Sequence, residues 1–257
     1  MELLLDPNQL ALLALVGIIA GFIDAIVGGG GLLSIPALLA IGIPPHLALG
    51  TNKLAACFGS ITSSYTYYKQ QLFTPKFWQT CATATFIGAI LGSGLVFLIN
   101  ADWLEKLLPL LIISIAIYTL FSPKAMGNKA TKAPCNKPSN TKQTLQGLAL
   151  GGYDGFAGPG IGAFWTVSSI SLYKLPLLQS CALARIMTSV SNITALVIFA
   201  SLGQVNWILG LWMGVCMMAG SFIGARSAIR FGIPFIKPLF IISVVSIATH
   251  LAWTAWA

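Results

Sequence analysis

Long apolar runs alternate with short polar gaps along almost the whole chain. Five runs precede one longer polar stretch and five follow it, at about residues 9–27, 31–43, 51–68, 77–99, 103–121, 144–157, 161–173, 179–202, 206–230 and 235–256. A helix that crosses a bilayer needs about 20 apolar residues, and most of these runs come close to that length. The pattern therefore predicts an all-α membrane protein, a polytopic bundle of about 8–10 membrane segments that include short, broken helices.

Composition indicates contact with lipid rather than with water. Of the 257 residues, 56% are hydrophobic and 8% are charged, whereas about 25% of the residues in a soluble domain are charged. The net charge of +8 comes from basic residues in the gaps between apolar runs, not from a polar face that nucleic acid could bind. Composition thus excludes a soluble enzyme, a disordered regulator and a secreted disulfide scaffold. It predicts a lipid bilayer, and no nucleic acid, as partner.

The sequence lacks the residue patterns on which enzymes and metal sites are usually built. It contains no GxSxG, HExxH or GxxxxGK[ST] motif. Five cysteines are scattered singly, without metal-ligand spacing, and this scatter also argues against disulfides. The first residues carry no basic group, so we expect the first apolar run to stay as a membrane segment rather than serve as a signal peptide. We expect no catalytic residue, no metal and no cofactor.

The polar stretch 122–143 divides the chain. It holds five lysines and no long apolar run, a composition typical of a solvated, flexible connection. We therefore predict a first membrane repeat at 1–121, a basic cytoplasmic linker at 122–143 and a second membrane repeat at 144–257.

The two sets of apolar runs align as copies of each other. An offset of about 130 residues pairs polar, glycine and proline positions in the same order: Asp24 with Asp154, Gly28 with Gly158, Pro44 with Pro176, Lys53 with Arg185, and Pro109 with Pro238. Matched leucines would mean little in apolar sequences, but matched positions of these types are much less common by chance. We infer a tandem duplication.

The distribution of charge predicts the orientation in the membrane. If every run crosses once, the linker and most other basic gaps fall on one side, and the four acidic residues outside the apolar runs' interiors, Glu2, Asp6, Asp102 and Glu105, fall on the other. Cytoplasmic loops carry the excess of Lys and Arg, so we expect a cytoplasmic linker and external termini. Five crossings per copy would make the repeats inverted. Counting the first two runs of each copy as one crossing gives an eight-helix, parallel alternative, which divides the positive charge nearly evenly.

The second run of each copy is short and opens with glycine. The first copy has Gly28, Gly29, Gly30 and Gly31, and the second has Gly158, Pro159 and Gly160. A helix that begins inside the membrane leaves its first N–H groups unpaired, and these groups, with the positive end of the helix dipole, can bind an anion. The alternative is that the glycines only allow helices to pack closely. Gly17, Gly21, Gly88 and Gly92 fit that alternative well.

Charged residues occupy matched positions in the third run of each copy. Lys53 and Arg185 lie near the start of that run and could form a cationic pair that faces an anion. Nearby hydroxyl and amide groups could add donors; these belong to Thr51, Asn52, Ser60, Ser189 and Asn192. The alternatives are that Lys53 reaches the membrane surface and that Arg185 forms a structural ion pair.

Two acidic residues, Asp24 and Asp154, precede the glycine runs by four residues. Within a membrane such carboxylates could relay protons and so couple transport to a proton gradient, or they could neutralise Lys53 or Arg185. The sequence leaves both roles open.

Four segments together resemble the TauE/SafE family of sulfite and organosulfonate exporters. They are GFIDAIVGGGG at 21–31, ALGTNK at 48–53, GGYDGFAGPG at 151–160 and GSFIGAR at 220–226. The resemblance spans roughly residues 10–256 and implies an inner-membrane secondary transporter of sulfur-containing anions, with the glycine-rich elements and the polar residues after them lining the pathway. The second copy has ALAR at 182–185 where the first has GTNK at 50–53, so strict two-fold symmetry of the site is not expected.

These observations lead to one main hypothesis. We expect a transporter that moves a small anionic solute, a sulfur oxyanion or a sulfonate, by alternating access. A passive anion channel and a non-transporting membrane scaffold or assembly subunit stay open as alternatives, and so does assembly into a homo-oligomer.

Overall fold

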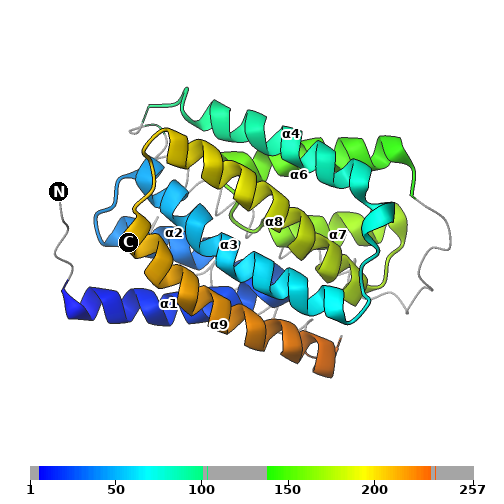
Figure 1. Cartoon of the computed structure of the whole chain (residues 1–257), viewed down its shortest axis with the longest axis horizontal. Helices are drawn as coiled ribbons and strands as arrows, with labels where there is room; N and C mark the ends of the chain where they lie inside the picture. Colours follow the sequence, from blue (N-terminus) through cyan, green and yellow to red (C-terminus); the bar gives the residue numbers. More distant parts are fainter. Residues whose placement is uncertain (1–5, 101–102, 104–137, 233–234, 236–257) are drawn as a thin grey trace, which may run out of the picture.

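The computed structural model describes residues 6–100, 103, 138–232 and 235, and every regular element among them is helical. The helices are α1 (Pro7–Val27), α2 (Gly31–Ala40), α3 (Pro45–Lys69), the 3-10 turn η1 (Pro75–Phe77), α4 (Gln79–Val96), α6 (Asn140–Phe156), α7 (Ile161–Tyr173), α8 (Leu177–Ser201) and α9 (Trp207–Phe231) (Figure 1). The all-α membrane fold predicted from the sequence is confirmed. The predicted segments 103–121 and 235–256 and most of the linker lie outside the described residues.

Several predicted boundaries were wrong, for identifiable reasons. The third segment begins at Pro45, not near residue 51, because proline fits the first turn of a helix, where its missing N–H costs nothing. Lys53 and Arg185 therefore do not begin their helices; each lies eight residues after the first residue. Helix α6 begins at Asn140, so the last residues of the predicted linker form a polar first turn of this helix.

Glycines in the left-handed conformation separate the long helices from the short ones. Gly28 ends α1 with φ 87°, and Gly160, with φ 71°, stands directly before α7. The short helices α2 and α7 contain 10 and 13 residues, and a helix of that length rises only about 15–20 Å, less than the thickness of the hydrocarbon core. The two predicted broken helices are therefore present.

The bundle consists of two packing units, and each unit takes one helix from the other half of the chain. Unit A contains α1, α2 and α3 with α9, while unit B contains α6, α7 and α8 with α4. The seam between the units is mainly the contact of α3 with α8. Figure 1 shows α9 lying along α1 and α3, and α4 lying along α6. The helices α4 and α9 are thus exchanged between the halves.

Equivalent helices of the two halves run in opposite directions. Gly50 near the start of α3 meets Phe199 near the end of α8, and Ser64 near the end of α3 bonds Ser189 in the first half of α8. The colours of Figure 1 show the same reversal for α1 and α6. The parallel alternative would require equal directions, which these helices do not have. Because the fifth segment of each copy lies outside the described residues, inversion of the complete repeats stays a prediction.

Glycines allow the exchanged helices to approach backbone to backbone. A Cβ added at Gly21 would lie 2.2 Å from the carbonyl oxygen of Met217 in α9, and one at Gly92 would lie 1.9 Å from that of Gly152 in α6. Neither distance is possible for real atoms, so these positions require glycine. The packing role predicted for Gly17, Gly21, Gly88 and Gly92 is confirmed.

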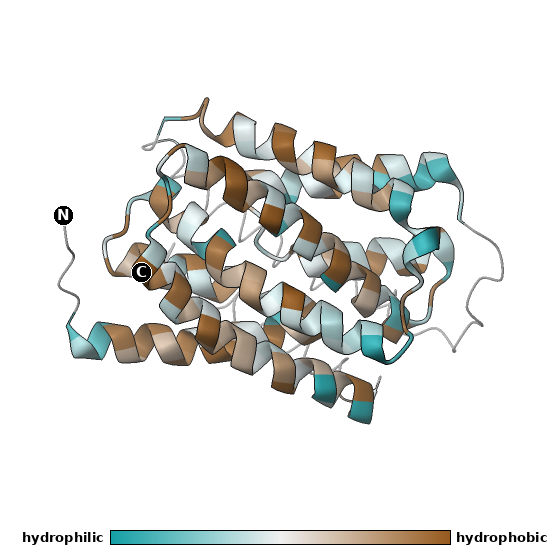
Figure 2. Cartoon of the chain, in the orientation of Figure 1, coloured by the Kyte–Doolittle hydropathy of each residue, from teal (hydrophilic) through white to brown (hydrophobic). Residues whose placement is uncertain are grey.

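The outer surface of the bundle is suited to lipid. Helices α1, α4, α8 and α9 are long and apolar enough to cross a membrane, and α1, α4 and α9 expose large hydrophobic side chains such as Leu15, Leu91 and Ile208. Hydrophilic residues gather at the end of the bundle where α3 and α9 end and α6 begins (Figure 2). Lys69 and Arg230 occupy the last turns of α3 and α9 at this end. The C-terminal ends of α3 and α9, each with a basic residue, thus lie at the same end of the bundle.

Candidate anion site between the two packing units

Two buried ion pairs cross the seam between the units. Lys53 Nζ of α3 lies 2.7 Å from Asp154 Oδ1 of α6, and Arg185 Nη1 of α8 lies 2.7 Å from Asp24 Oδ2 of α1. Each cation therefore pairs with the carboxylate of the opposite half. The structure thus brings these four predicted residues together. Lys53 does not reach the membrane surface, since its side chain is only 2% exposed.

The ammonium group of Lys53 is fully surrounded by acceptors. Besides Asp154 Oδ1, it donates to the backbone oxygen of Asp154 and, over 3.2 Å, to Asn192 Oδ1. The second carboxylate oxygen of Asp154 accepts from the hydroxyl of Ser191. This pair is 2% exposed on both sides and is closed to solvent.

The Arg185 pair is less completely satisfied. Asp24 accepts from Arg185 Nη1 and, through Oδ1, from the N–H of Gly30 over 3.1 Å, and its side chain is 13% exposed. Arg185 Nη2 is buried and has no hydrogen-bond partner among the described residues. The guanidinium group thus keeps spare donor capacity in the centre of the protein.

The glycine breaks make room for both cations. A Cβ at Gly28 would lie 2.3 Å from Arg185 Nη2, and one at Gly158 would lie 2.9 Å from Lys53 Nζ. A Cβ at Gly162 would lie only 1.6 Å from Arg185 Nη2. Gly28 O also accepts from Gly162 N over 3.3 Å, so the breaks of the two halves touch. These glycines therefore allow close packing against the charged groups of the site.

Other predicted residues have partners of their own. The N–H of Gly30 already bonds Asp24 and is therefore not a free donor in this conformation. The carbonyl of Pro159 accepts from the hydroxyl of Tyr153 over 2.8 Å. A Cβ added at Gly29 would make only ordinary contacts, with the side chains of Leu32 and Ile23. Gly31 faces Pro159, so that it too lies where the breaks meet.

The hydroxyl and amide groups predicted as donors divide into two groups. Asn192 bonds Lys53, and Asn52 Oδ1 accepts from Ser34 over 2.5 Å at the edge of the same site. Thr51 instead accepts from the N–H of Asn206 before α9, and Ser189 bonds Ser64 and the carbonyl of Arg185. Thr51 and Ser189 do not contact the ion pairs through these bonds, so the structure does not bring every predicted donor together.

Sequence reasoning missed Ser191 and Ser34, and it placed Gly162 beside the second glycine run without assigning it to the site. Ser191 and Ser34 bond residues of the site, and Gly162 touches Arg185. Repeat matching could not find Ser191, because its equivalent in the first copy is Gly59. Gly162 was visible only as one more glycine beside a glycine run.

A family model for the sulfite exporter TauE/SafE matches residues 13–251. The chain belongs to the TauE/SafE family. It is 36% identical over 239 residues to a probable membrane transporter, YfcA, of Escherichia coli K12, covering 93% of this chain and 88% of the relative. It is 37% identical over 244 residues to a probable membrane transporter of Sinorhizobium, covering 95% and 92%. A Bacillus subtilis relative, YdhB, is 26% identical over 212 residues, covering 82% and 86%. No solved structure matches the chain.

In this TauE/SafE protein a small cavity lies between the two carboxylates. Its volume is about 20 Å³, and it is lined by Asp24, Asn52, Lys53, Asp154 and Asn192 together with small and apolar residues. A cavity needs about 10–15 Å³ of such volume to hold one water molecule. The space therefore fits a water molecule but not an oxyanion of several heavy atoms, and this conformation is closed around the ion pairs.

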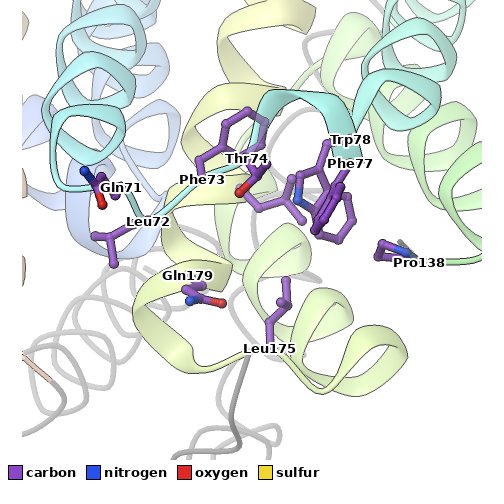
Figure 3. Close-up of a pocket in the computed structure, with 10 residues that line it drawn as sticks. Gln71, Leu72, Phe73, Thr74, Phe77, Trp78, Pro138, Leu175 and Gln179 are labelled. Atoms are coloured by element: carbon purple, nitrogen blue, oxygen red, sulfur yellow. The ribbon is translucent and has the colours of Figure 1, made fainter. Parts of the chain in front are cut away.

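A second, uncharged pocket lies where the α3–α4 and α7–α8 connections meet. It measures about 130 Å³, and Figure 3 shows Phe73, Phe77 and Trp78 on one side and Leu175 and Gln179 on the other. None of its lining residues belongs to the ion pairs. Among the described residues no cluster of His, Cys, Asp and Glu could hold a metal ion.

Proposed function

We propose that this protein is a secondary transporter that carries a small oxyanion, a sulfur oxyanion or a sulfonate, between its two packing units. The observation that carries this proposal is the pair of crossed, buried ion pairs, Lys53–Asp154 and Arg185–Asp24, at the contact of the two glycine breaks. An anion that competes with a carboxylate for either cation would act directly on an ion pair that joins the two units.

The cost of burying these four groups supports a functional role. Placing a charged side chain in a membrane costs at least about 2.5–3.5 kcal/mol on insertion scales. A buried ion pair often contributes no more stability than well-packed apolar residues of similar size. Two such pairs in the centre of a membrane protein therefore favour a role beyond stability. Guanidinium and ammonium groups are the common partners of oxyanions.

The family supports the class of cargo. Its model is named for a sulfite exporter, and several relatives are named as probable membrane transporters. Sulfite and sulfonates present oxygen atoms over which two negative charges or one are spread, which suits the planar fork of Arg185. We assign this class of anion to the present chain on those two grounds.

The two packing units supply a means of alternating access. Because α3 meets α8 along the seam and both ion pairs cross it, a rocking of unit A against unit B would open the site to one side at a time. The closed cavity of about 20 Å³ would then be the occluded state of this cycle. The end of the bundle that carries Lys69 and Arg230 would face the cytoplasm of a bacterial inner membrane.

Uptake by the purified full chain in liposomes tests the proposal. The assay offers labelled sulfite, thiosulfate and methanesulfonate, with acetate as the carboxylate control. We expect saturable uptake of a sulfur anion, a loss of at least about tenfold in kcat/KM for Arg185→Lys, since lysine lacks the fork, and a change of less than about twofold for Lys69→Ala. Lys69 is the matched control because it is a cation at the end of α3, where it lies over the ring of Tyr65.

The other outcomes separate the alternatives. Flux that rises linearly with concentration would favour a passive channel. If the folded protein takes up none of these anions, transport of this class is contradicted, and a non-transporting scaffold or assembly subunit is favoured. Equal uptake by Arg185→Lys and the unchanged protein would leave transport standing but remove Arg185 from the site.

A further inference from the structure

The two ion pairs occupy equivalent repeat positions but differ in spare bonding capacity. Lys53 has three N–H groups and three acceptors, and both carboxylate oxygens of Asp154 accept from side chains. Arg185, in contrast, has a buried Nη2 without a partner in the part of the chain that the structure describes, and Asp24 receives its second bond from a backbone N–H. An anion therefore finds unused donors at Arg185 and none at Lys53.

The cluster as described carries no net charge. It contains the cations Lys53 and Arg185 and the carboxylates Asp24 and Asp154. An added monovalent anion would leave one uncompensated negative charge in a buried site, which is strongly unfavourable. If the anion takes the place of Asp24 on Arg185, one proton bound by the released carboxylate restores a net charge of zero in the cluster.

We propose that Arg185 is the anion-binding cation and that Asp24 takes up one proton for each monovalent anion bound, while the Lys53–Asp154 pair stays closed. This inference rests on the proposed function and assigns its site and its coupling. The proton comes from water on the side to which the site is open. Protonated Asp24 leaves Arg185 Nη1, and Nη1 and Nη2 together hold two oxygens of the anion. Release of the anion on the other side returns the proton and restores the Asp24 bond to Arg185.

The position of Asp24 suits this exchange. Its side chain lines the small cavity, and it is 13% exposed whereas that of Asp154 is 2% exposed. The donor Nη2 lies between Gly28 and Gly162, whose backbones are joined by one hydrogen bond. Separation of the two glycine breaks would therefore uncover the spare donor as the site opens.

Charged and titratable groups face Asp24 from three of the neighbouring elements. They are Arg185 from α8, Lys53 and the hydroxyl of Tyr67 from α3, and Asp154 from α6. The short helix α2 brings only the N–H of Gly30. Helix α9, which packs along α1, carries Arg226 and Arg230, and these lie over the rings of Phe222 and Phe231. The described neighbours therefore offer no histidine, and Asp24 is the carboxyl group nearest the spare donor.

Proton uptake on ligand binding tests the proposal. Methanesulfonate is added to the purified full chain in weakly buffered detergent solution, and bound anion and proton uptake are measured together. This probe is the anion of a strong acid, so any proton that disappears is bound by the protein. We expect about one proton per bound anion near neutral pH and an affinity that weakens by about tenfold for each unit of rising pH.

The two equivalent aspartates provide matched variants. In Asp24→Asn we expect binding without proton uptake and an affinity that changes less than about twofold between pH 6 and 8. Asp24→Glu, which keeps a titratable carboxyl group, should restore about one proton per anion. If Asp154→Asn abolishes proton uptake and Asp24→Asn retains it, the assignment is wrong.

The outcomes also separate this inference from the proposed function. Binding of methanesulfonate to the unchanged protein without proton uptake would overturn the inference and leave anion transport standing. Absence of binding together with absence of liposome uptake would overturn both. The stoichiometry of the unchanged protein decides whether a proton is taken up, and Asp24→Glu tests the assignment to Asp24 if Asp24→Asn does not fold.

Discussion

The ion pairs Lys53–Asp154 and Arg185–Asp24 occupy equivalent positions in the two repeats but differ in how completely they are hydrogen-bonded. Both pairs have an N–O distance of 2.7 Å and cross the same seam. In the second half, Ser191 and Asn192 complete the bonding around Lys53 and Asp154, whereas the equivalent residues of the first half are Gly59 and Ser60. The hydroxyl of Ser60 donates to the carbonyl of Cys57 over 3.4 Å. Among the described residues, one ion pair thus has partners for all the donors of its cation, and the equivalent pair has an unused donor at Arg185 Nη2.

Breaking each pair singly should give the largest effect and should reveal this difference. Lys53→Met leaves Asp154 as a buried carboxylate without its cation, and we expect a loss of about 3–5 kcal/mol in the free energy of unfolding. Arg185→Met leaves Asp24 partly exposed and bonded to Gly30 N–H, so we expect roughly half that loss. Unfolding of both variants in detergent, followed by tryptophan fluorescence, measures the two losses.

The double variant Lys53→Met with Asp154→Leu is the control for the first loss. Because it removes both charges, it should recover most of the stability that Lys53→Met loses. Equal losses for the two single variants would contradict the asymmetry of the pairs.

Filling the space beside Arg185 should have a smaller but selective effect. A methyl group in Gly162→Ala would overlap Arg185 Nη2 and the Cα of Gly28, and overpacking of this kind costs about 1–3 kcal/mol. The matched control is Gly152→Ala, since a Cβ there has its nearest neighbour at 3.6 Å, an ordinary contact. Thermal unfolding of both variants and anion binding by both would test this. A Gly162→Ala protein that binds anion as tightly as Gly152→Ala would place the anion away from Nη2.

Removing the hydroxyl that Asp154 uses should give a change of about the same size as Gly162→Ala. Ser191→Ala deletes one donor to a buried carboxylate, and hydrogen bonds to charged groups contribute about 1.5–3 kcal/mol. Ser60→Ala, a serine of α3 near the equivalent position, should change the unfolding free energy by less than about 0.5 kcal/mol, because its bond is long. Similar values for both serines would mean that Asp154 does not depend on Ser191.

The sequence was enough to predict the described long and short helices and the breaks, and to single out the four charged residues that pair, because these depend on local composition and on positions repeated in each copy. It was not enough to predict the partners. Lys53 pairs with Asp154 rather than Asp24 because the halves face each other across the seam, and this contact leaves no local pattern. The hydrogen-bond partners of Thr51 and Ser189 could not be predicted either. Thr51, for example, accepts from the N–H of Asn206, which precedes the exchanged helix α9. The start of α3 was missed because a proline-led, weakly apolar turn precedes the apolar run.

The exchange of α4 and α9 also sets the order in which the chain can be assembled during synthesis. Asp24 precedes Arg185 by 161 residues, and Gly21 precedes its partner Ser221 by 200. Until the second half is inserted, α1 therefore enters the membrane with a carboxylate that has no cation and a glycine face that has no cover. Contacts of such long sequence separation form late and leave intermediates exposed to misassembly. A chain that stops after α8 would have neutralised its buried charges but left α1 and α3 without the helix that packs along them.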